Sequence, residues 1–149
     1  ACSPKVRFQP RSAISQVLRL YENKLSILPT QIGKLVNLGS TLNVYDNSFS
    51  SSIPSQLGNL AALSSYFYLY SNKFSSTIAT QLGRLENFGR GFSLRYNSLT
   101  GSAPTQLGRL TDLWYGMYLM SNKLCDDVPT EMQVRLNHSI DTAADTLCR

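Results

Sequence analysis

Apolar residues recur along this chain in blocks of about 25 residues, and each block ends on an asparagine. The second block is typical, with Leu35, Leu38, Leu42 and Val44 ahead of Asn47. The asparagines are Asn23, Asn47, Asn72, Asn97 and Asn122, at intervals of 24, 25, 25 and 25 residues. A repeat of this length predicts similar coils that stack on their neighbours and share one continuous core.

Polar and apolar residues alternate just before each asparagine, as in Leu42-Asn43-Val44. This period of two predicts a short strand in every coil, paired in parallel with its counterpart in the next coil. We expect the asparagine to turn inward, so that its amide satisfies backbone groups that no regular ladder reaches. Pro-Thr or Pro-Ser steps follow later in the coil and predict a short helical turn that the hydroxyl can cap. Ala79 replaces the proline in one coil and predicts a looser turn there.

The part of the unit after the asparagine also recurs, as in NSFSSSIPSQLGNL and NSLTGSAPTQLGRL. Over residues 14–136 the pattern resembles the plant-type leucine-rich repeat, LxxLxxLxLxxNxLxGxIPxxLGxL, found in plant receptor ectodomains, polygalacturonase inhibitors and algal proteins. The resemblance implies an α/β solenoid, a right-handed superhelix with a parallel concave sheet and short helical or irregular convex segments. It divides the chain into an irregular segment 1–13, five repeats over 14–136 and a C-terminal cap over 137–149.

Two features depart from the family pattern. Every full copy carries one extra residue before its strand, as at Gly39-Ser40-Thr41 and Trp114-Tyr115-Gly116, and we expect a bulge there. The glycine that follows the xNxL step survives only as Gly101. Ser51, Ser76 and Asp126 take the equivalent places, which puts the convex-side strand in doubt.

Aligned by repeat, seven of the eight tyrosines fall on the outward positions of the strand region. With Arg95 they form the predicted partner-binding face: Tyr21, Tyr45, Tyr66, Tyr68, Tyr70, Arg95, Tyr96 and Tyr118. Tyrosine gives a large contact area with a polar tip, which favours a binding surface. Tyrosines that merely stack on one another after repeat duplication are the alternative. Arg95 continues one tyrosine row and is expected to stack on Tyr70 as a cation–π pair.

The net charge of +5 biases the chain towards an anionic partner, such as an acidic protein. Its basic residues are dispersed and accompany no nucleic-acid motif, so nucleic acid is not expected as a partner. Lys34, Arg84 and Arg109 line up on the convex side, either as a solvated edge or as a contact for an acidic partner or membrane surface. No apolar run approaches the length of a transmembrane helix.

Three cysteines are present, and their spacing fits no zinc or redox motif. Cys125 and Cys148 predict a disulfide that would hold the C-terminal segment over the end of the core. Such a bond favours a secreted or lumenal location, whereas reduced thiols in the cytoplasm are the alternative. Cys2 is then left over, either free or separated from a partner that this sequence lacks.

No catalytic motif is found, and the single histidine, His138, has no second ligand near it in sequence. We therefore expect neither an enzyme nor a metal or other cofactor. The leading hypothesis is a protein–protein interaction module that binds a partner on the tyrosine-rich concave face. The alternative is a structural accessory subunit docked in a larger assembly through its open first coil. A minor alternative is an ice-binding protein, suggested by Ser and Thr rows, or a glycosidase inhibitor, suggested by the family resemblance.

Overall fold

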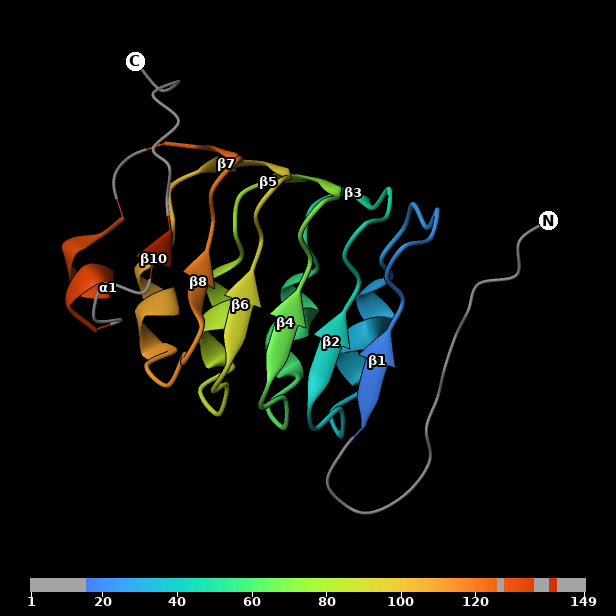
Figure 1. Cartoon of the computed structure of the whole chain (residues 1–149), viewed down its shortest axis with the longest axis horizontal. Helices are drawn as coiled ribbons and strands as arrows, with labels where there is room; N and C mark the ends of the chain where they lie inside the picture. Colours follow the sequence, from blue (N-terminus) through green and yellow to red (C-terminus); the bar gives the residue numbers. More distant parts are fainter. Residues whose placement is uncertain (1–15, 126–127, 136–139, 142–149) are drawn as a thin grey trace.

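The computed structural model describes residues 16–125, 128–135 and 140–141. The predicted N-terminal segment 1–13 and all of the predicted cap except 140–141 lie outside this part, so the proposed division of the chain stays a prediction. The described coils stack side by side into a solenoid (Figure 1). One broad sheet covers one side, a row of short helices lies behind it, and a narrow second sheet follows the upper edge.

The larger sheet has six parallel strands in the order β1-β2-β4-β6-β8-β10. These are β1 (Val17–Arg19), β2 (Thr41–Asn43), β4 (Tyr66–Tyr68), β6 (Gly91–Ser93), β8 (Gly116–Tyr118) and β10 (Ile140–Asp141). Their central residues pair in register from Leu18 through Leu42, Phe67 and Phe92 to Met117, and all are buried. The predicted α/β solenoid with a parallel sheet is thereby confirmed.

A second parallel sheet forms where the missing glycines left the convex-side strand in doubt. It consists of β3 (Ser50–Ser51), β5 (Lys73–Ser76), β7 (Ser98–Gly101) and β9 (Lys123–Leu124). Gly101 has a φ of +73°, and Ser51 and Ser76 adopt nearly the same backbone with φ values of +71° and +70°. A left-handed residue other than glycine costs about 1–2 kcal/mol. Pairing with the neighbouring coils is sufficient to hold the two serines there.

Among the described residues, the side opposite the large sheet carries four 3₁₀ helices and one α-helix. The helices are η1 (Thr30–Lys34), η2 (Ser55–Asn59), η3 (Thr80–Arg84), η4 (Thr105–Arg109) and α1 (Thr130–Arg135). The expected hydroxyl cap is wrong, because the cap position of each 3₁₀ helix is the preceding proline or Ala79 and no side chain caps it. Ala79 adopts the same backbone as the prolines, since its φ of −68° matches the −72° of Pro29, and the looser turn expected there stays a prediction.

The 3₁₀ helices lie so close together that η1, η2 and η3 each need a glycine at the contact with the next helix. A methyl group built on Gly58 would overlap the backbone carbonyl of Gln81, and one on Gly83 would overlap that of Gln106. Backbone of a neighbouring coil cannot withdraw without disturbing the stack. The recurrent LG pair of the sequence therefore sets the spacing of the coils on the helical side.

Between the sheets and the helices runs one continuous hydrophobic core. Phenylalanines of successive coils stack on each other, with ring centroids 5.0 Å apart for Phe67 and Phe92 and 5.8 Å apart for Phe49 and Phe74. Burial of such side chains contributes about 1.5–3 kcal/mol each. The core thus links every coil to its neighbours, as stacked repeats require.

The asparagines line the turn that follows each strand of the large sheet. Asn72 is representative: its Nδ2 donates to the carbonyls of Leu69 and Tyr70 in its own coil, and to Val44 in the preceding coil. Its Oδ1 accepts from the backbone N–H of Phe49 at 3.1 Å. The amides of Asn47, Asn72, Asn97 and Asn122 therefore each connect two coils through backbone groups that the strands leave unpaired.

The extra residue of each copy lies in the turn that enters the strand. The N–H groups of Ser65 and Tyr66 both donate to the carbonyl of Ser40, at 2.9 and 3.3 Å. Two residues of one coil thus oppose one residue of its neighbour, which is the arrangement of a local bulge. The turn projects below the sheet (Figure 1), so the residues that precede each strand lie at its lower rim.

Candidate ligand-binding face

A row of parallel tyrosine rings crosses the first coils of the large sheet. The ring centroids of Tyr21 and Tyr45 lie 4.8 Å apart, and those of Tyr45 and Tyr70 lie 4.6 Å apart, with an interplanar angle of 4° in both pairs. The rings follow the coil spacing because equivalent positions of parallel strands lie about 4.8 Å apart. The ring faces of these three tyrosines therefore pack against one another.

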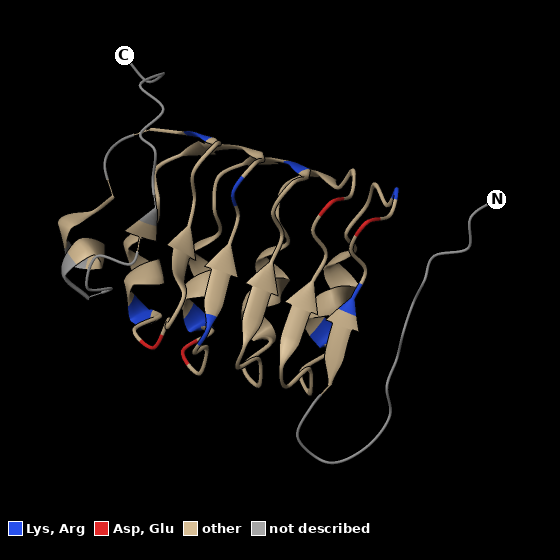
Figure 2. Cartoon of the chain, in the orientation of Figure 1, with Lys and Arg blue, Asp and Glu red and all other residues tan. Residues whose placement is uncertain are grey.

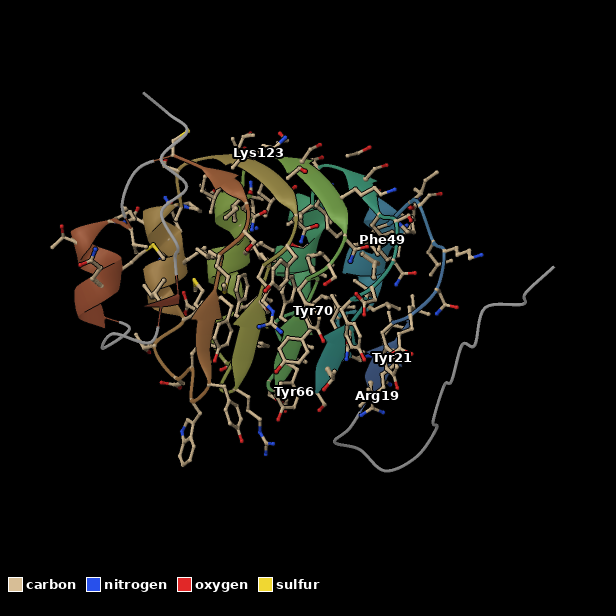
Figure 3. All side chains as sticks on the ribbon, turned by 45° about the horizontal axis from the view of Figure 1, so that its top comes forward. Arg19, Tyr21, Phe49, Tyr66, Tyr70 and Lys123 are labelled. Atoms are coloured by element: carbon tan, nitrogen blue, oxygen red, sulfur yellow. The ribbon has the colours of Figure 1, made fainter. Side chains whose placement is uncertain are left out.

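A second group of rings surrounds β4. Tyr66 and Tyr68 lie on this strand with ring centroids 5.1 Å apart, and Tyr68 meets Tyr70 edge to face at 5.7 Å. Figure 3 shows Tyr21, Tyr66 and Tyr70 on the same side of the molecule. Phe49, by contrast, belongs to the buried core. The two groups join at Tyr70 and form one aromatic surface.

Arg95 occupies the next place in the tyrosine row, after Tyr70. Its guanidinium carbon lies 5.0 Å from the ring centroid of Tyr70, 5.5 Å from that of Tyr96 and 5.9 Å from that of Tyr118. The expected cation–π contact with Tyr70 is therefore present, together with two more. These contacts bring Tyr96 and Tyr118 into the same surface, so the structure assembles all eight residues predicted for this face.

Sequence reasoning missed the lower rim of this surface, formed by Arg90, Trp114 and Tyr115. The Arg90 guanidinium carbon lies 5.8 Å from the Tyr66 ring centroid, and Arg90 Nη1 donates to the Tyr66 hydroxyl at 3.4 Å. The ring centroids of Tyr115 and Tyr66 lie 6.4 Å apart. The indole of Trp114 is 88% exposed. These side chains come from the inserted turns, and one further column of the repeat alignment, Ser40-Ser65-Arg90-Tyr115, contains two of them.

Several hydroxyls of the face hold their protons more tightly than free tyrosine. Burial, the neighbouring Tyr70 and Glu22 raise the pKa of Tyr45 to about 12, and the Tyr45 hydroxyl donates to Glu22 Oε1 at 3.3 Å. Burial and the adjacent Tyr66, Tyr70 and Tyr118 raise the pKa of Tyr68 to about 12 as well. Burial also raises the pKa of Tyr70, although Arg95 opposes this shift. The hydroxyls are therefore neutral hydrogen-bond donors at physiological pH.

Charge is unevenly spread over the face. The segments that follow β1 and β2 are red in Figure 2 and carry Glu22 and Asp46, whereas the segment after β6 is blue and carries Arg95. Equivalent positions in the later coils hold Ser71, Tyr96 and Ser121. The first two coils therefore present acidic groups, and the middle of the face presents a cation among aromatic rings.

Outside this face, the described residues offer little other chemistry. They contain no cluster of three or more His, Cys, Asp and Glu side chains that would suit a metal ion. None of the described helices has the length and apolar character needed to cross a membrane. Cys125 is disulfide-bonded. Its predicted partner Cys148 lies outside the described residues, so the pairing itself stays a prediction.

Known proteins share both the repeat and the solenoid. The family model of the Leucine Rich Repeat matches residues 40–60. The ectodomain of the Arabidopsis receptor kinase HAESA, solved with an N-terminal extended IDA peptide hormone, superposes with a TM-score of 0.74 at 30% identity. These matches support a leucine-rich repeat protein of the plant type. The HAESA match covers 86% of the chain but only 21% of the ectodomain, so the chain spans about a fifth of that receptor domain.

Two further solved structures that resemble this chain are not described as receptors. A leucine-rich repeat protein of Leptospira interrogans has 30% identity and a TM-score of 0.64, with 86% of this chain and 30% of that chain covered. A plant ice-binding protein has 28% identity and a TM-score of 0.64, with coverage of 72% and 34%. A search of curated protein sequences gives no significant match. Similar folds thus support several roles, and the site must decide between them.

Proposed function

We propose that this leucine-rich repeat protein is a binding module without catalytic activity, and that a protein or peptide docks on the concave tyrosine surface. The observation that carries the proposal is the continuous aromatic field from Tyr21 to Tyr118, joined through Arg95. Tyrosine and arginine are the residue types in which interface hot spots are enriched, and charged residues other than arginine are depleted there. The HAESA structure, in which a leucine-rich repeat ectodomain holds a peptide hormone, supports a binding role for this fold.

Ring stacking also stabilises the fold, and a useful test must separate the two roles. We propose affinity capture from the source extract with wild type, with the double variant Tyr45→Ser, Tyr70→Ser, and with Lys73→Ser, Thr100→Ser as a control. The control changes exposed side chains of the second sheet and leaves the tyrosines intact.

The proposal expects at least one protein that wild type and the control retain equally, and that the tyrosine double variant loses. The affinity of that purified protein should fall by about tenfold or more in the double variant, because each central anchor contributes roughly 1–2 kcal/mol. Circular dichroism checks that the variant remains folded. Equal capture by a folded double variant would mean that the tyrosines stack only for stability.

A secreted or lumenal location accompanies this proposal. The disulfide at Cys125 supports an oxidising compartment, and the receptor relatives are extracellular ectodomains by their description. Peptide mapping without reduction would test the pairing. A peptide joining Cys125 to Cys148 is expected, and one joining Cys125 to Cys2 would refute that pairing.

The first coil supports a second candidate function, end-on docking into a larger assembly. Leu35 is 41% exposed, whereas Leu60, Leu85 and Leu110 at equivalent positions are fully buried by the coil before them. An uncovered apolar coil end is typical of a contact for another chain. Light scattering tests this idea: wild type should self-associate more than Leu35→Lys, and a purely monomeric wild type would contradict it.

The second sheet supports ice binding as a third candidate. Ser50–Ser52, Ser75–Thr77 and Thr100–Ser102 form uncharged rows at the coil spacing, and the plant ice-binding protein shares 28% identity with the chain. Ice growth should then be inhibited by wild type and restored by Thr77→Lys. Normal ice growth at high wild-type concentration would remove this candidate.

A further inference from the structure

Arg95 stands at the centre of the concave face without an anionic partner. The three nearest ring centroids lie 5.0, 5.5 and 5.9 Å from its guanidinium carbon. The one salt bridge among the described residues joins Arg109 to Glu86 on the opposite side of the coils. Arg95 Nε is buried and donates to no acceptor. The cation is thus surrounded by rings but lacks a carboxylate.

Such an arrangement is incomplete by the ordinary rules for buried polar groups. Aromatic faces attract the guanidinium, but they do not accept its in-plane N–H groups as an oxygen does. Ser93 is the preceding outward residue of β6, is only 3% exposed, and its Oγ also has no hydrogen-bond partner. Ser93 on β6, Arg95 two residues beyond it and Asn43 on β2 thus each carry a buried atom that lacks a partner among the described residues. Buried polar groups normally have one.

The surroundings favour a negatively charged group over a positive or neutral one. Arg90 adds a second positive charge to the same half of the face, beside Tyr66. The acidic residues of the face, Glu22 and Asp46, lie in the first two coils, and Glu22 already accepts from Tyr45. The hydroxyls of Tyr68 and Tyr70 stay protonated, so they remain donors. The middle of the face offers hydrogen-bond donors and positive charge, and what it lacks is an anionic acceptor.

We propose that Arg95 is the recognition point for a carboxylate of an acidic peptide segment, with the tyrosine rings around it holding the guanidinium in place. A planar guanidinium matches a carboxylate in two parallel hydrogen bonds. Because Arg95 Nε is buried, the two terminal Nη groups are the donors left for the ligand. This inference rests on the proposed function of the concave face and names the chemistry of its central contact. A carboxylate from a side chain or from a peptide C-terminus satisfies the same requirement.

The test is a titration of wild-type protein, followed through the Nε–Hε signals of arginine in ¹⁵N-labelled samples. The probes are an N-acetylated, C-amidated tetraglutamate, an N-acetylated tetra-alanine with a free C-terminus, and a blocked tetralysine. We expect the Arg95 signal to shift with the acidic probe before that of the exposed Arg84, and not to shift with tetralysine. A response to tetra-alanine as well identifies a terminal carboxylate as the source, and a response to tetraglutamate alone identifies side chains.

Variants give the second measurement. Arg95→Gln should weaken tetraglutamate binding by about tenfold or more, and Arg95→Lys by less, because lysine keeps the charge but loses the fork. Arg84→Gln removes the same charge from the helical side and should change binding by less than about twofold. An Arg95 signal that no carboxylate probe shifts, or equal weakening by Arg95→Gln and Arg84→Gln, would overturn the inference. A captured partner that needs Tyr45 and Tyr70 but not Arg95 would leave the proposed function intact and refute this inference alone.

Discussion

The asparagine ladder allows a quantitative prediction, because its members differ in how many hydrogen bonds they make. Asn72 donates to three carbonyls at 3.1, 3.1 and 3.2 Å and accepts from one N–H at 3.1 Å. Asn23 donates to Leu20 and Tyr21 at 3.0 and 2.8 Å, and no N–H of the described residues donates to its Oδ1. The two residues therefore form a matched pair inside one molecule.

The magnitude follows from counting bonds. Two amide protons of Asn72 are shared among three carbonyls, so it makes the equivalent of about three hydrogen bonds, each worth about 1 kcal/mol net. We expect Asn72→Ala to lower the free energy of unfolding by about 3 kcal/mol, and by more where the carbonyls stay buried without a donor. Asn23→Ala should cost only about 1 kcal/mol, because its two bonds lie at the exposed end of the ladder. In a chain of this size, 1 kcal/mol corresponds to roughly 2–4 °C in Tm.

Urea unfolding followed by far-ultraviolet circular dichroism measures both variants, with the slope of free energy against urea checked for a change in cooperativity. Asn72→Asp provides an isosteric control. The aspartate keeps an oxygen that accepts from the Phe49 N–H, but its second oxygen replaces the amide nitrogen and faces three carbonyl oxygens. This variant should therefore lower the free energy of unfolding at least as much as Asn72→Ala. Equal losses for Asn72→Ala and Asn23→Ala, or a loss below about 1 kcal/mol at Asn72, would refute the view that the amides stabilise the stack by pairing its backbone.

Other predictions follow from the backbone and the tyrosines. Gly83→Ala should destabilise the fold by about 3 kcal/mol in the same urea assay, whereas Gly89→Ala, whose added methyl would lie 3.6 Å from the nearest atom, should change it little. Both Ser76 and Gly101 have a left-handed backbone conformation, which glycine adopts more readily than serine. Ser76→Gly should therefore raise the free energy of unfolding by roughly 0.5–1 kcal/mol, and Gly101→Ser should lower it by about 1–2 kcal/mol. Shifts in the opposite sense would contradict this account. The folded-state pKa of Tyr45, about 12, exceeds the ordinary value of 10, so its contribution to stability is complete below pH 10 and is lost between pH 10 and 12. The free energy of unfolding, measured between pH 10 and 12, should decline as the pH rises. In Tyr45→Phe this decline should be smaller, because phenylalanine does not titrate.

The sequence alone predicted the solenoid, the strand before each asparagine and the columns of the concave face. It did so because each coil contacts only its neighbours, so a residue at a fixed place in the repeat meets its counterpart one period later. The pairing of Thr41 with Tyr66 and of Asn43 with Tyr68 follows directly from that period. The contact of Arg95 with Tyr70 could be foreseen for the same reason.

Only the tertiary structure decided two kinds of feature. One depends on the direction of side chains, and the other on backbone conformations that neighbouring coils hold in place. The second sheet forms through left-handed serines, which local preference disfavours and which pairing between coils maintains. The contact of Tyr115 and Arg90 with Tyr66 depends on how the inserted turns bend, and the period does not contain that information. Likewise, the missing partners of Arg95 and Ser93 became visible only once every neighbour had been placed, because a hydrogen bond is set by distance and direction and not by column alone.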